Sequence, residues 1–160
     1  MKKKSFFYAL VSLLISACSS VKKTVKKPLK ANKTQVNRII DNALNYRGVK
    51  YKYGGITNKG MDCSGLIYVA FSEEKVQLPR ISRNMAKKGK RISLDKVRKG
   101  DLLFFKTNKS SNQINHVGLV TSVNNGQIKF IHSTTSKGVI ISSFSQQYWK
   151  NAFVKATKVL

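Results

Sequence analysis

The chain has 160 residues, of which 31 are lysine or arginine and 6 are aspartate or glutamate, so its formal net charge is +25. Without the first 17 residues the chain is long enough for one domain with a single core and little else, so we expect a single domain. The basic excess favours a polyanionic neighbour, unless the lysines do no more than solvate the surface.

The first 17 residues predict an export signal. Three lysines at 2–4 precede an apolar run at residues 6–15, and small residues follow at 16–17. The run is too short to span a bilayer stably and has the flanks of a signal peptide, the alternative being an uncleaved membrane helix. We therefore assign residues 1–17 to a signal peptide.

The residue after the signal is a cysteine. Ile15-Ser16-Ala17-Cys18 resembles a bacterial lipobox, which implies cleavage before Cys18 and a diacylglyceryl thioether on its sulphur. Several acyl chains on one residue anchor firmly, since each buried methylene contributes roughly 0.8 kcal/mol. Ser19, in place of an aspartate, implies an outer-membrane lipoprotein that faces the periplasm. A plain secretory signal is the alternative.

Residues 19–33 carry six lysines and one proline with little apolar content. This composition predicts a lipidated, flexible and basic tether over residues 18–33. Export, together with the lack of a recognised nucleic-acid motif, argues against nucleic acid as the polyanionic partner. Anionic lipid head groups and the carboxylates of cell-wall peptide stems are the better candidates.

A helical pattern begins at Thr34, where we place the start of a domain over residues 34–160. Apolar residues recur at i, i+3, i+4, i+7 and i+8, namely Val36, Ile39, Ile40, Ala43 and Leu44. Gly48 lies just past the end of this pattern, as is typical of a helix terminus. A loop containing Tyr51, Tyr53, Gly54 and Gly55 then leads to Asp62.

A second helix is predicted from Cys63 to about Glu74. Cys63 falls in its first turn, where unpaired N–H groups and the helix dipole stabilise an anion, so we expect a thiol pKa lowered toward the reactive thiolate. If Cys18 carries a thioether, Cys63 has no disulfide partner and is a free thiol in an oxidising compartment. Such a thiol is a nucleophile or, alternatively, a buried inert cysteine.

The chain changes period after a short third helix, predicted over Arg83–Lys88 with Ser82 as its cap and Gly89 at its end. Five β-branched or aromatic runs separated by glycine and asparagine turns follow, at residues 102–106, 117–123, 127–131, 139–143 and 152–159. Helices followed by strands predict an α+β domain, with N-terminal helices packed on an antiparallel sheet of about five strands.

Both histidines lie in one predicted hairpin. A three-residue loop at 124–126 would set His116 opposite Thr134, with His132 one diagonal step away on the same face. A two-residue loop would put the two rings on opposite faces. Gly126 suits the left-handed position of a three-residue loop, so the sequence predicts the longer loop and a co-facial pair.

A nucleophile, a base and a polar group that orients the base form a catalytic triad. Cys63, His116 and His132 can fill these roles in that order. The alternatives are that each histidine is structural, or that one cysteine and two histidines bind a metal, for which they lack close spacing. We therefore expect a cysteine hydrolase that needs neither a metal nor an organic cofactor.

Six motifs in order resemble the NlpC-type family of papain-like cell-wall peptidases, over about Val36 to Val159. They are Tyr51-Lys52-Tyr53-Gly54-Gly55, Gly60-Met61-Asp62-Cys63-Ser64-Gly65-Leu66, Leu78-Pro79-Arg80, Lys99-Gly100-Asp101-Leu102, His116-Val117-Gly118 and Phe130-Ile131-His132-Ser133. The resemblance implies a papain-like fold and a Cys-His-polar triad carried by Cys63, His116 and His132.

The resemblance also implies roles for residues around the triad. The Tyr53 hydroxyl and the backbone N–H of Cys63 would hold the oxyanion, unless Tyr53 is only a packed aromatic. Asp62, Ser64 and Arg80 would bind the charged groups of a peptide stem. The alternatives are that Asp62 caps the helix and that Arg80 pairs with a core carboxylate.

A closer resemblance is to the small lipoprotein murein endopeptidases of Gram-negative envelopes, through the lipid anchor, the basic tether and the segments at 136–143 and 148–150. It implies an enzyme that cleaves D-alanyl–meso-diaminopimelyl cross-links, and we expect a monomer. Alternatives are a γ-D-glutamyl–diamino acid endopeptidase, a non-catalytic wall-binding lipoprotein and an acyltransferase. Two departures are a longer hairpin between the histidines and Met85 in place of a glutamine, the second of which we expect to affect the substrate groove.

Overall fold

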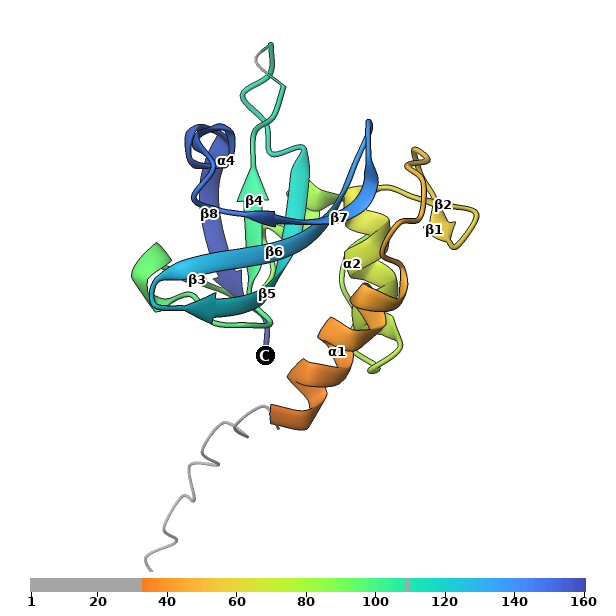
Figure 1. Cartoon of the computed structure of the whole chain (residues 1–160), viewed down its shortest axis with the longest axis horizontal. Helices are drawn as coiled ribbons and strands as arrows, with labels where there is room; N and C mark the ends of the chain where they lie inside the picture. Colours follow the sequence, from red (N-terminus) through yellow and green to blue (C-terminus); the bar gives the residue numbers. More distant parts are fainter. Residues whose placement is uncertain (1–32, 109) are drawn as a thin grey trace, which may run out of the picture.

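The structure, a computed structural model, describes residues 33–108 and 110–160. The expected signal peptide at 1–17, the lipid-attachment residue Cys18 and most of the tether lie outside the described residues. In the described part, a six-stranded antiparallel sheet forms the centre, and two helices cover one of its faces (Figure 1).

The two helices on that face are the ones that the sequence predicts. Helix α1 spans Lys33–Asn45 and helix α2 spans Cys63–Ser72. Ile39 and Ala43 of α1 are fully buried, because apolar residues at helical spacing line one face. α1 ends before Gly48, whose φ of +87° lies in the left-handed region that favours glycine.

The sheet has the strand order β3-β8-β4-β5-β6-β7, and every neighbouring pair is antiparallel. Its strands span Lys90–Ile92 (β3), Leu102–Phe105 (β4), His116–Asn124 (β5), Gln127–Thr134 (β6), Gly138–Ser143 (β7) and Phe153–Lys158 (β8). This architecture confirms the predicted α+β class. The additional strand is β3, which is too short and too polar to show an alternating apolar pattern.

Several other elements are also too short to give a periodic signal in the sequence. A hairpin of Ile56–Thr57 (β1) and Gly60–Met61 (β2) leads into α2. A 3-10 helix, η1, spans Leu94–Lys96, and α4 spans Gln147–Ala152 immediately before β8. Of these elements, β2 and α4 bear on the site, because β2 precedes Cys63 and α4 carries Trp149.

Helix α3 differs from its prediction. It spans Ser82–Met85, and Ile81 occupies its cap position without a side-chain hydrogen bond. Ser82 is therefore the first residue of the helix and not its cap. Met85 is fully buried in the core and does not line the cavity beside Cys63, so the expectation that it affects a substrate groove finds no support in its position.

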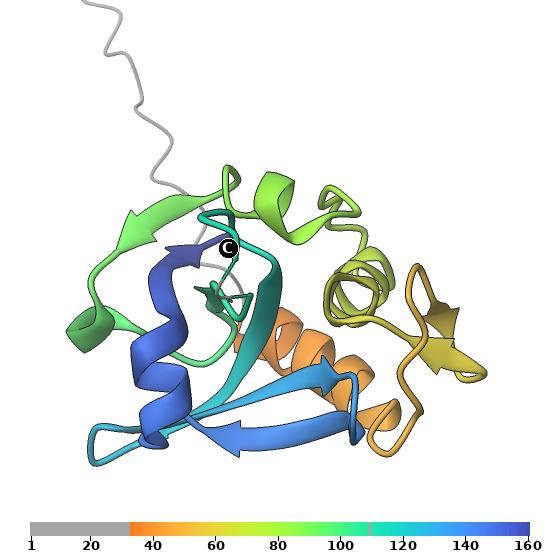
Figure 2. The same ribbon diagram turned by 90° about the horizontal axis from the view of Figure 1, so that it is seen from above.

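Alternate residues of the central strands supply two hydrophobic clusters. Phe104 belongs to the cluster that the sheet shares with α1 and α2, whereas Phe105 belongs to a cluster with Phe130 and Trp149. Successive strand residues point to opposite faces, which explains this division. Seen from above, α1 and α2 lie on one side of the sheet and α4 at the other (Figure 2).

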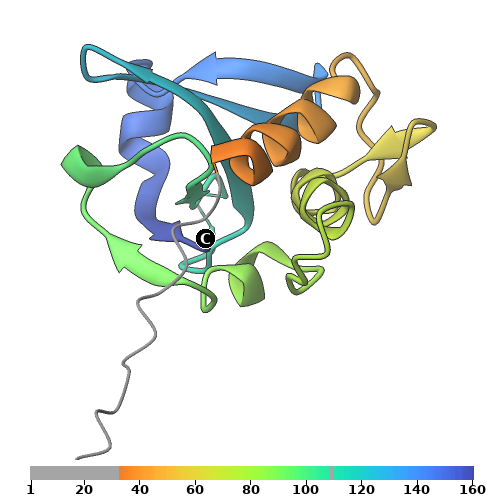
Figure 3. The same ribbon diagram turned by 90° about the horizontal axis from the view of Figure 1, so that it is seen from below.

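The C-terminus lies beside the first turn of α1, as the view from below shows (Figure 3). Val159 and Leu160 pack against the same cluster as Val36, so the two ends of the described chain meet on one side of the domain. Within residues 33–108 and 110–160, no helix has the length and the apolar character needed to cross a membrane.

The hairpin that carries both histidines has a different turn from the predicted one. Asn124 pairs with Gln127, so its loop has two residues, Asn125 and Gly126, both with positive φ. Positive φ at both central residues is what a two-residue hairpin turn of this type requires. The predicted three-residue loop, which would pair Val123 with Gln127, is therefore wrong.

A β-bulge restores the predicted register further along the hairpin. The pairing steps past Thr121, as the partners on either side show: Ser122 with Lys129, and Val120 with Phe130. This extra residue shifts the strand by the one step that the shorter loop removes. His116 and His132 consequently lie on the same face, as predicted, although the reason is the bulge and not the loop.

Candidate active site

Cys63 occupies the first position of α2, as the sequence predicts. Asp62 caps the helix, because its Oδ1 accepts a hydrogen bond from the backbone N–H of Gly65 at 2.6 Å. Close packing requires the glycine, since a Cβ at Gly65 would collide with the carbonyl oxygen of Gly55. The order Asp-Cys-Ser-Gly thus fixes the thiol at the helix start and packs that turn against the preceding loop.

The Cys63 thiol is buried and faces the segment that leads into β5. Its Sγ donates to the carbonyl oxygen of Asn115 at 3.9 Å, and the backbone N–H of Val117 is directed at it. Burial raises the pKa of the thiol to about 11, although backbone N–H groups oppose the rise. The expected lowering of this pKa is therefore wrong, because desolvation outweighs the helix start.

His116 and His132 form a hydrogen-bonded pair. Nε2 of His116 lies 2.9 Å from Nδ1 of His132, and the two rings are close to perpendicular, at 89°. Because His132 engages Nε2, Nδ1 is the ring nitrogen of His116 that remains for the predicted proton exchange with the thiol. Cys63 and His116 line the same hollow of about 180 Å³, so the three residues can act in the predicted order.

An aromatic shell surrounds the two histidines. The indole of Trp149 stacks on His116 with ring centroids 5.4 Å apart and meets His132 edge-on at 4.7 Å. Phe130 lies against His132, also at 4.7 Å. Burial lowers the pKa of His116 to about 4 and, together with the charge on His116, lowers that of His132 to about 3. Both rings are therefore neutral at neutral pH.

A charged pair lies on the helical side of the thiol. Nη1 and Nη2 of Arg80 donate to Oδ1 and Oδ2 of Asp62 at 2.9 and 2.8 Å, and Nη1 also donates to the Ser64 hydroxyl at 3.0 Å. Burial acts to raise the pKa of Asp62, but Arg80 and backbone donors together hold it below its usual range.

The structure thus brings Asp62, Ser64 and Arg80 together, as residues expected to bind substrate. These three side chains form most of their hydrogen bonds with one another. The backbone N–H of Gly54 also donates to Asp62 at 2.8 Å. Asp62 is both the helix cap and the partner of Arg80. Both alternative roles that the sequence leaves open, cap and ion pair, are therefore present in the structure.

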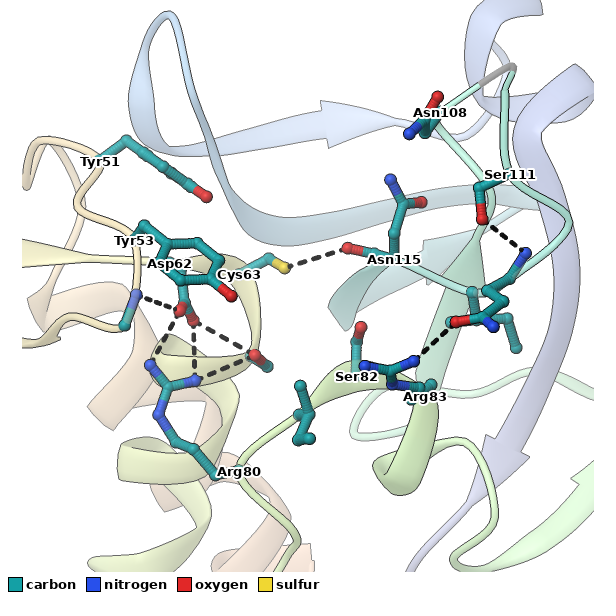
Figure 4. Close-up of a pocket in the computed structure, with 15 residues that line it drawn as sticks. Tyr51, Tyr53, Asp62, Cys63, Arg80, Ser82, Arg83, Asn108, Ser111 and Asn115 are labelled. Atoms are coloured by element: carbon teal, nitrogen blue, oxygen red, sulfur yellow. Dashed lines mark hydrogen bonds and ion pairs between the residues drawn. The ribbon is translucent and has the colours of Figure 1, made fainter.

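A larger cavity of about 460 Å³ opens beside Cys63 (Figure 4). Asp62, Ser64 and Arg80 line this cavity, whereas His116 lines the smaller hollow. Cys63 belongs to both linings. The thiol therefore stands between the larger cavity and the smaller hollow that contains His116.

Comparison with known proteins identifies the domain. The model of the NlpC/P60 family matches residues 48–158. The chain belongs to the NlpC/P60 family. The matched range contains the thiol, both histidines and the charged pair, so the membership covers the whole of the site.

Two curated relatives in this family come from Escherichia coli strain K12. The murein DD-endopeptidase MepS/murein LD-carboxypeptidase is 39% identical over 125 residues, which are 78% of this chain and 63% of that protein. The probable endopeptidase NlpC is 36% identical over 152 residues, which are 94% of this chain and 96% of that protein. The chain therefore spans less than two thirds of the first relative and nearly all of the second.

A solved structure of the family has the same fold. It is the crystal structure of a protein described as similar to lipoprotein, NLP/P60 family, from Staphylococcus aureus. The two structures superpose with a TM-score of 0.72 at 29% sequence identity, covering 86% of this chain and 45% of that one. This likeness confirms the family fold over the described domain.

Two tyrosines of this NlpC/P60 domain lie near the thiol in different settings. Tyr53, to which the resemblance assigns the oxyanion, is 88% exposed and lines the larger cavity, and its role stays a prediction. Tyr51 lines both spaces, and burial together with the charge of Cys63 raises the pKa of its hydroxyl. Tyr51 is therefore a second tyrosine that lines the spaces next to Cys63, and sequence reasoning leaves it without a role.

Ser142 is a further residue that sequence reasoning misses. Its hydroxyl lies 2.8 Å from Nε2 of His132, and the residue is buried on β7. For His116 to accept a proton at Nδ1, its Nε2–H must donate to Nδ1 of His132, which must then carry its own proton on Nε2. In that tautomer the Ser142 hydroxyl is placed to accept the hydrogen bond from Nε2–H of His132.

The part of the chain that the structure describes contains no cluster of side chains suited to binding a metal ion. No group of three or more histidine, cysteine, aspartate or glutamate side chains is placed there to hold a metal ion. Three ring nitrogens of the histidine pair are engaged with each other or with Ser142. The arrangement is suited to the movement of a proton between Cys63 and His116.

Proposed function

We propose that this protein is a cysteine endopeptidase that cleaves D-alanyl–meso-diaminopimelyl cross-links between the peptide stems of peptidoglycan. One observation carries the proposal: Cys63 shares a hollow with His116, which is hydrogen-bonded to His132, in a domain of the NlpC/P60 family. The relative named as a murein DD-endopeptidase supports the cross-link as the substrate.

Catalysis starts from uncharged groups, because the thiol pKa is raised and the histidine pKa is lowered. As Sγ of Cys63 attacks the scissile carbonyl, Nδ1 of His116 takes the thiol proton. The new charge on His116 is stabilised through Nε2–H, which donates to His132. The backbone N–H of Cys63 and a tyrosine hydroxyl donate to the oxyanion.

His116 then donates its proton to the leaving amine, and a water molecule hydrolyses the thioester with the same ring as base. Because His116 lines the smaller hollow, the leaving group departs on that side. The stem that donates the acyl group therefore occupies the larger cavity beside Asp62 and Arg80.

The test compares the full chain with two single variants on purified sacculi. Cys63→Ala removes the nucleophile, whereas Cys18→Ser removes the other cysteine and serves as the matched control. Released muropeptides are identified by mass spectrometry. We expect loss of cross-linked dimers, with stems of unchanged length, in the unaltered chain and in Cys18→Ser but not in Cys63→Ala.

Other products would point to other reactions. Dipeptide stems would assign the cut to the γ-D-glutamyl–diamino acid bond, and transfer to an added amine would indicate an acyltransferase. Identical digests from the unaltered chain and Cys63→Ala, with both proteins sedimenting with sacculi, would contradict catalysis. The protein would then be a non-catalytic wall-binding lipoprotein.

We also propose that Cys18 carries the lipid that anchors a monomeric enzyme to the outer membrane, with its domain in the periplasm. The support is the signal-like segment at 1–17 and the lipobox that ends at Cys18. A palmitate analogue should label the unaltered chain, which should fractionate with the outer membrane, and should not label Cys18→Ser. Equal labelling of the two chains would contradict the anchor, and a dimer in sedimentation velocity would contradict the monomer.

A further inference from the structure

Two arginines line the larger cavity, and their charges are compensated differently. Arg80 donates to both carboxylate oxygens of Asp62. Arg83 donates from Nη1 to the side-chain Oε1 of Gln113 at 2.6 Å. An amide oxygen orients a guanidinium but does not neutralise it, so the charge of Arg83 is available to an anion.

The balance of charges in the cavity points the same way. Among the described residues that line it, Asp62 is the single acid, and Arg80 and Arg83 are the two bases. Cys63 adds no charge at rest, because burial raises its pKa to about 11. The described residues of the cavity wall therefore carry one positive charge in excess, located at Arg83.

The position of Arg83 matches the part of the substrate that fills this space. Arg83 donates to Gln113, and Figure 4 shows Arg83 on the other side of the drawn site from Asp62 and Arg80. The acyl-donor stem occupies this cavity in the proposed reaction. A γ-linked glutamate in that stem keeps a free α-carboxylate, whichever of the two candidate bonds is cut.

We propose that Arg83 binds a free carboxylate of the acyl-donor stem and thereby makes the enzyme select stems with free carboxylates over stems with carboxamides. The inference rests on the proposed function. Arginine suits this role, since its planar fork of N–H donors can bind a carboxylate through two hydrogen bonds while Gln113 holds one remaining donor.

The test uses two soluble cross-linked dimers that differ only in a carboxylate or a carboxamide on the acyl-donor glutamate. We expect the full chain to prefer the carboxylate dimer on the order of tenfold in kcat/KM, mainly through KM. Arg83→Gln should bring the ratio close to one, and Arg83→Glu should reverse it. Arg91→Gln removes an exposed arginine on β3, outside the cavity, and should keep the ratio.

A wild-type ratio in Arg83→Gln would overturn the inference, and so would an equal loss in Arg91→Gln, which would indicate the general charge of the protein. If the unaltered chain cleaves neither dimer, the proposed reaction fails. In that case calorimetric binding of both dimers to Cys63→Ala, with and without Arg83→Gln, decides the carboxylate site alone. Equal affinity for the two dimers in Cys63→Ala would refute it.

Discussion

The two sides of Cys63 use opposite chemistry. The side of α2 is called the polar side. There Asp62 and Arg80 form an ion pair next to the larger cavity, in which the guanidinium nitrogens donate hydrogen bonds to the carboxylate oxygens. On the sheet side, called here the aromatic side, His116 and His132 form a neutral pair packed against Trp149.

In the proposed reaction, this difference separates substrate recognition on the polar side from proton transfer on the aromatic side. Asp62 and Arg80 stay charged on the polar side because they form hydrogen bonds with each other. A base must instead be uncharged before it can accept a proton, and burial among aromatic rings keeps His116 in that form. A buried aromatic environment would destabilise the charges of Asp62 and Arg80, and a charged, hydrated one would let His116 take up a proton at higher pH.

Acid should destabilise the aromatic side first, and this is the largest effect that we expect. The unfolded state binds protons at histidine near pH 6.5, whereas folded His116 and His132 do so only near pH 4 and 3. Stability therefore falls as the pH drops from about 6.5 toward about 4, by more than about 3 kcal/mol, since each pKa unit is worth about 1.4 kcal/mol. Urea unfolding across this range measures the loss.

The control for acid destabilisation is His132→Gln, which removes one of the two titrating rings. Its stability should depend less steeply on pH, because one proton fewer is taken up on unfolding. Asp62 has a lowered pKa and loses its contribution only below its ordinary value of 3.8, so it does not act in this window. A stability that stays flat between about pH 6.5 and about pH 4 would contradict the neutral pair.

Asp62→Asn should break the polar side while it keeps the helix cap, because asparagine also caps well. Arg80 is then left without its partner, which costs roughly 3 kcal/mol in a partly buried pair. The free energy of unfolding from urea denaturation measures the loss. Asp95→Asn, at an exposed position on η1, is the control, and an equal small change in both variants would show that the ion pair contributes little.

Ser142→Ala tests the tautomers of the aromatic side. Without the hydroxyl, the Nε2–H of His132 loses its buried acceptor, and kcat should fall on the order of tenfold while KM stays unchanged. Ser142→Thr restores a hydroxyl and should recover most of the rate. Ser143→Ala, one residue along β7, is the control. A loss that threonine does not recover would indicate packing in place of tautomer control.

Trp149→Leu should have the smallest effect at neutral pH. It opens the aromatic shell and lets water approach His116, so the pKa of that ring should rise toward its ordinary value of 6.5. The acid limb of the kcat/KM profile should move to higher pH. Phe153→Leu alters an aromatic residue that contacts Phe105 and Phe144 and should leave the limb in place; if both variants shift it equally, the stacking on His116 is not the cause.

The sequence predicts the two principal helices well because their local patterns are strong. Val36, Ile39 and Ala43 repeat at helical spacing, and Asp62 before Cys63 marks a capped helix start. Strand β3 and helix α4 give no such signal, because three and six residues are too few to show a period.

The sequence predicts which residues form the site, but it predicts less well the hairpin turn, the pKa of Cys63 and the contact made by Ser142. The co-facial histidines follow from a bulge at Thr121, which compensates for a turn that the sequence predicts wrongly. The pKa of Cys63 depends on burial by segments distant in the chain, which a local helix argument does not include. Ser142 becomes meaningful only when β6 and β7 pair and place its hydroxyl beside His132.

The resting protonation state of Cys63 is the most direct test of the division between the two sides. The full chain with Cys18→Ser carries one thiol, and its rate of alkylation by iodoacetamide is measured against pH. We expect the rate to keep rising through alkaline pH, because the thiol stays protonated until the pH approaches about 11. A plateau of fast alkylation already reached in mildly acidic solution would show a resting thiolate–imidazolium pair and contradict a neutral base.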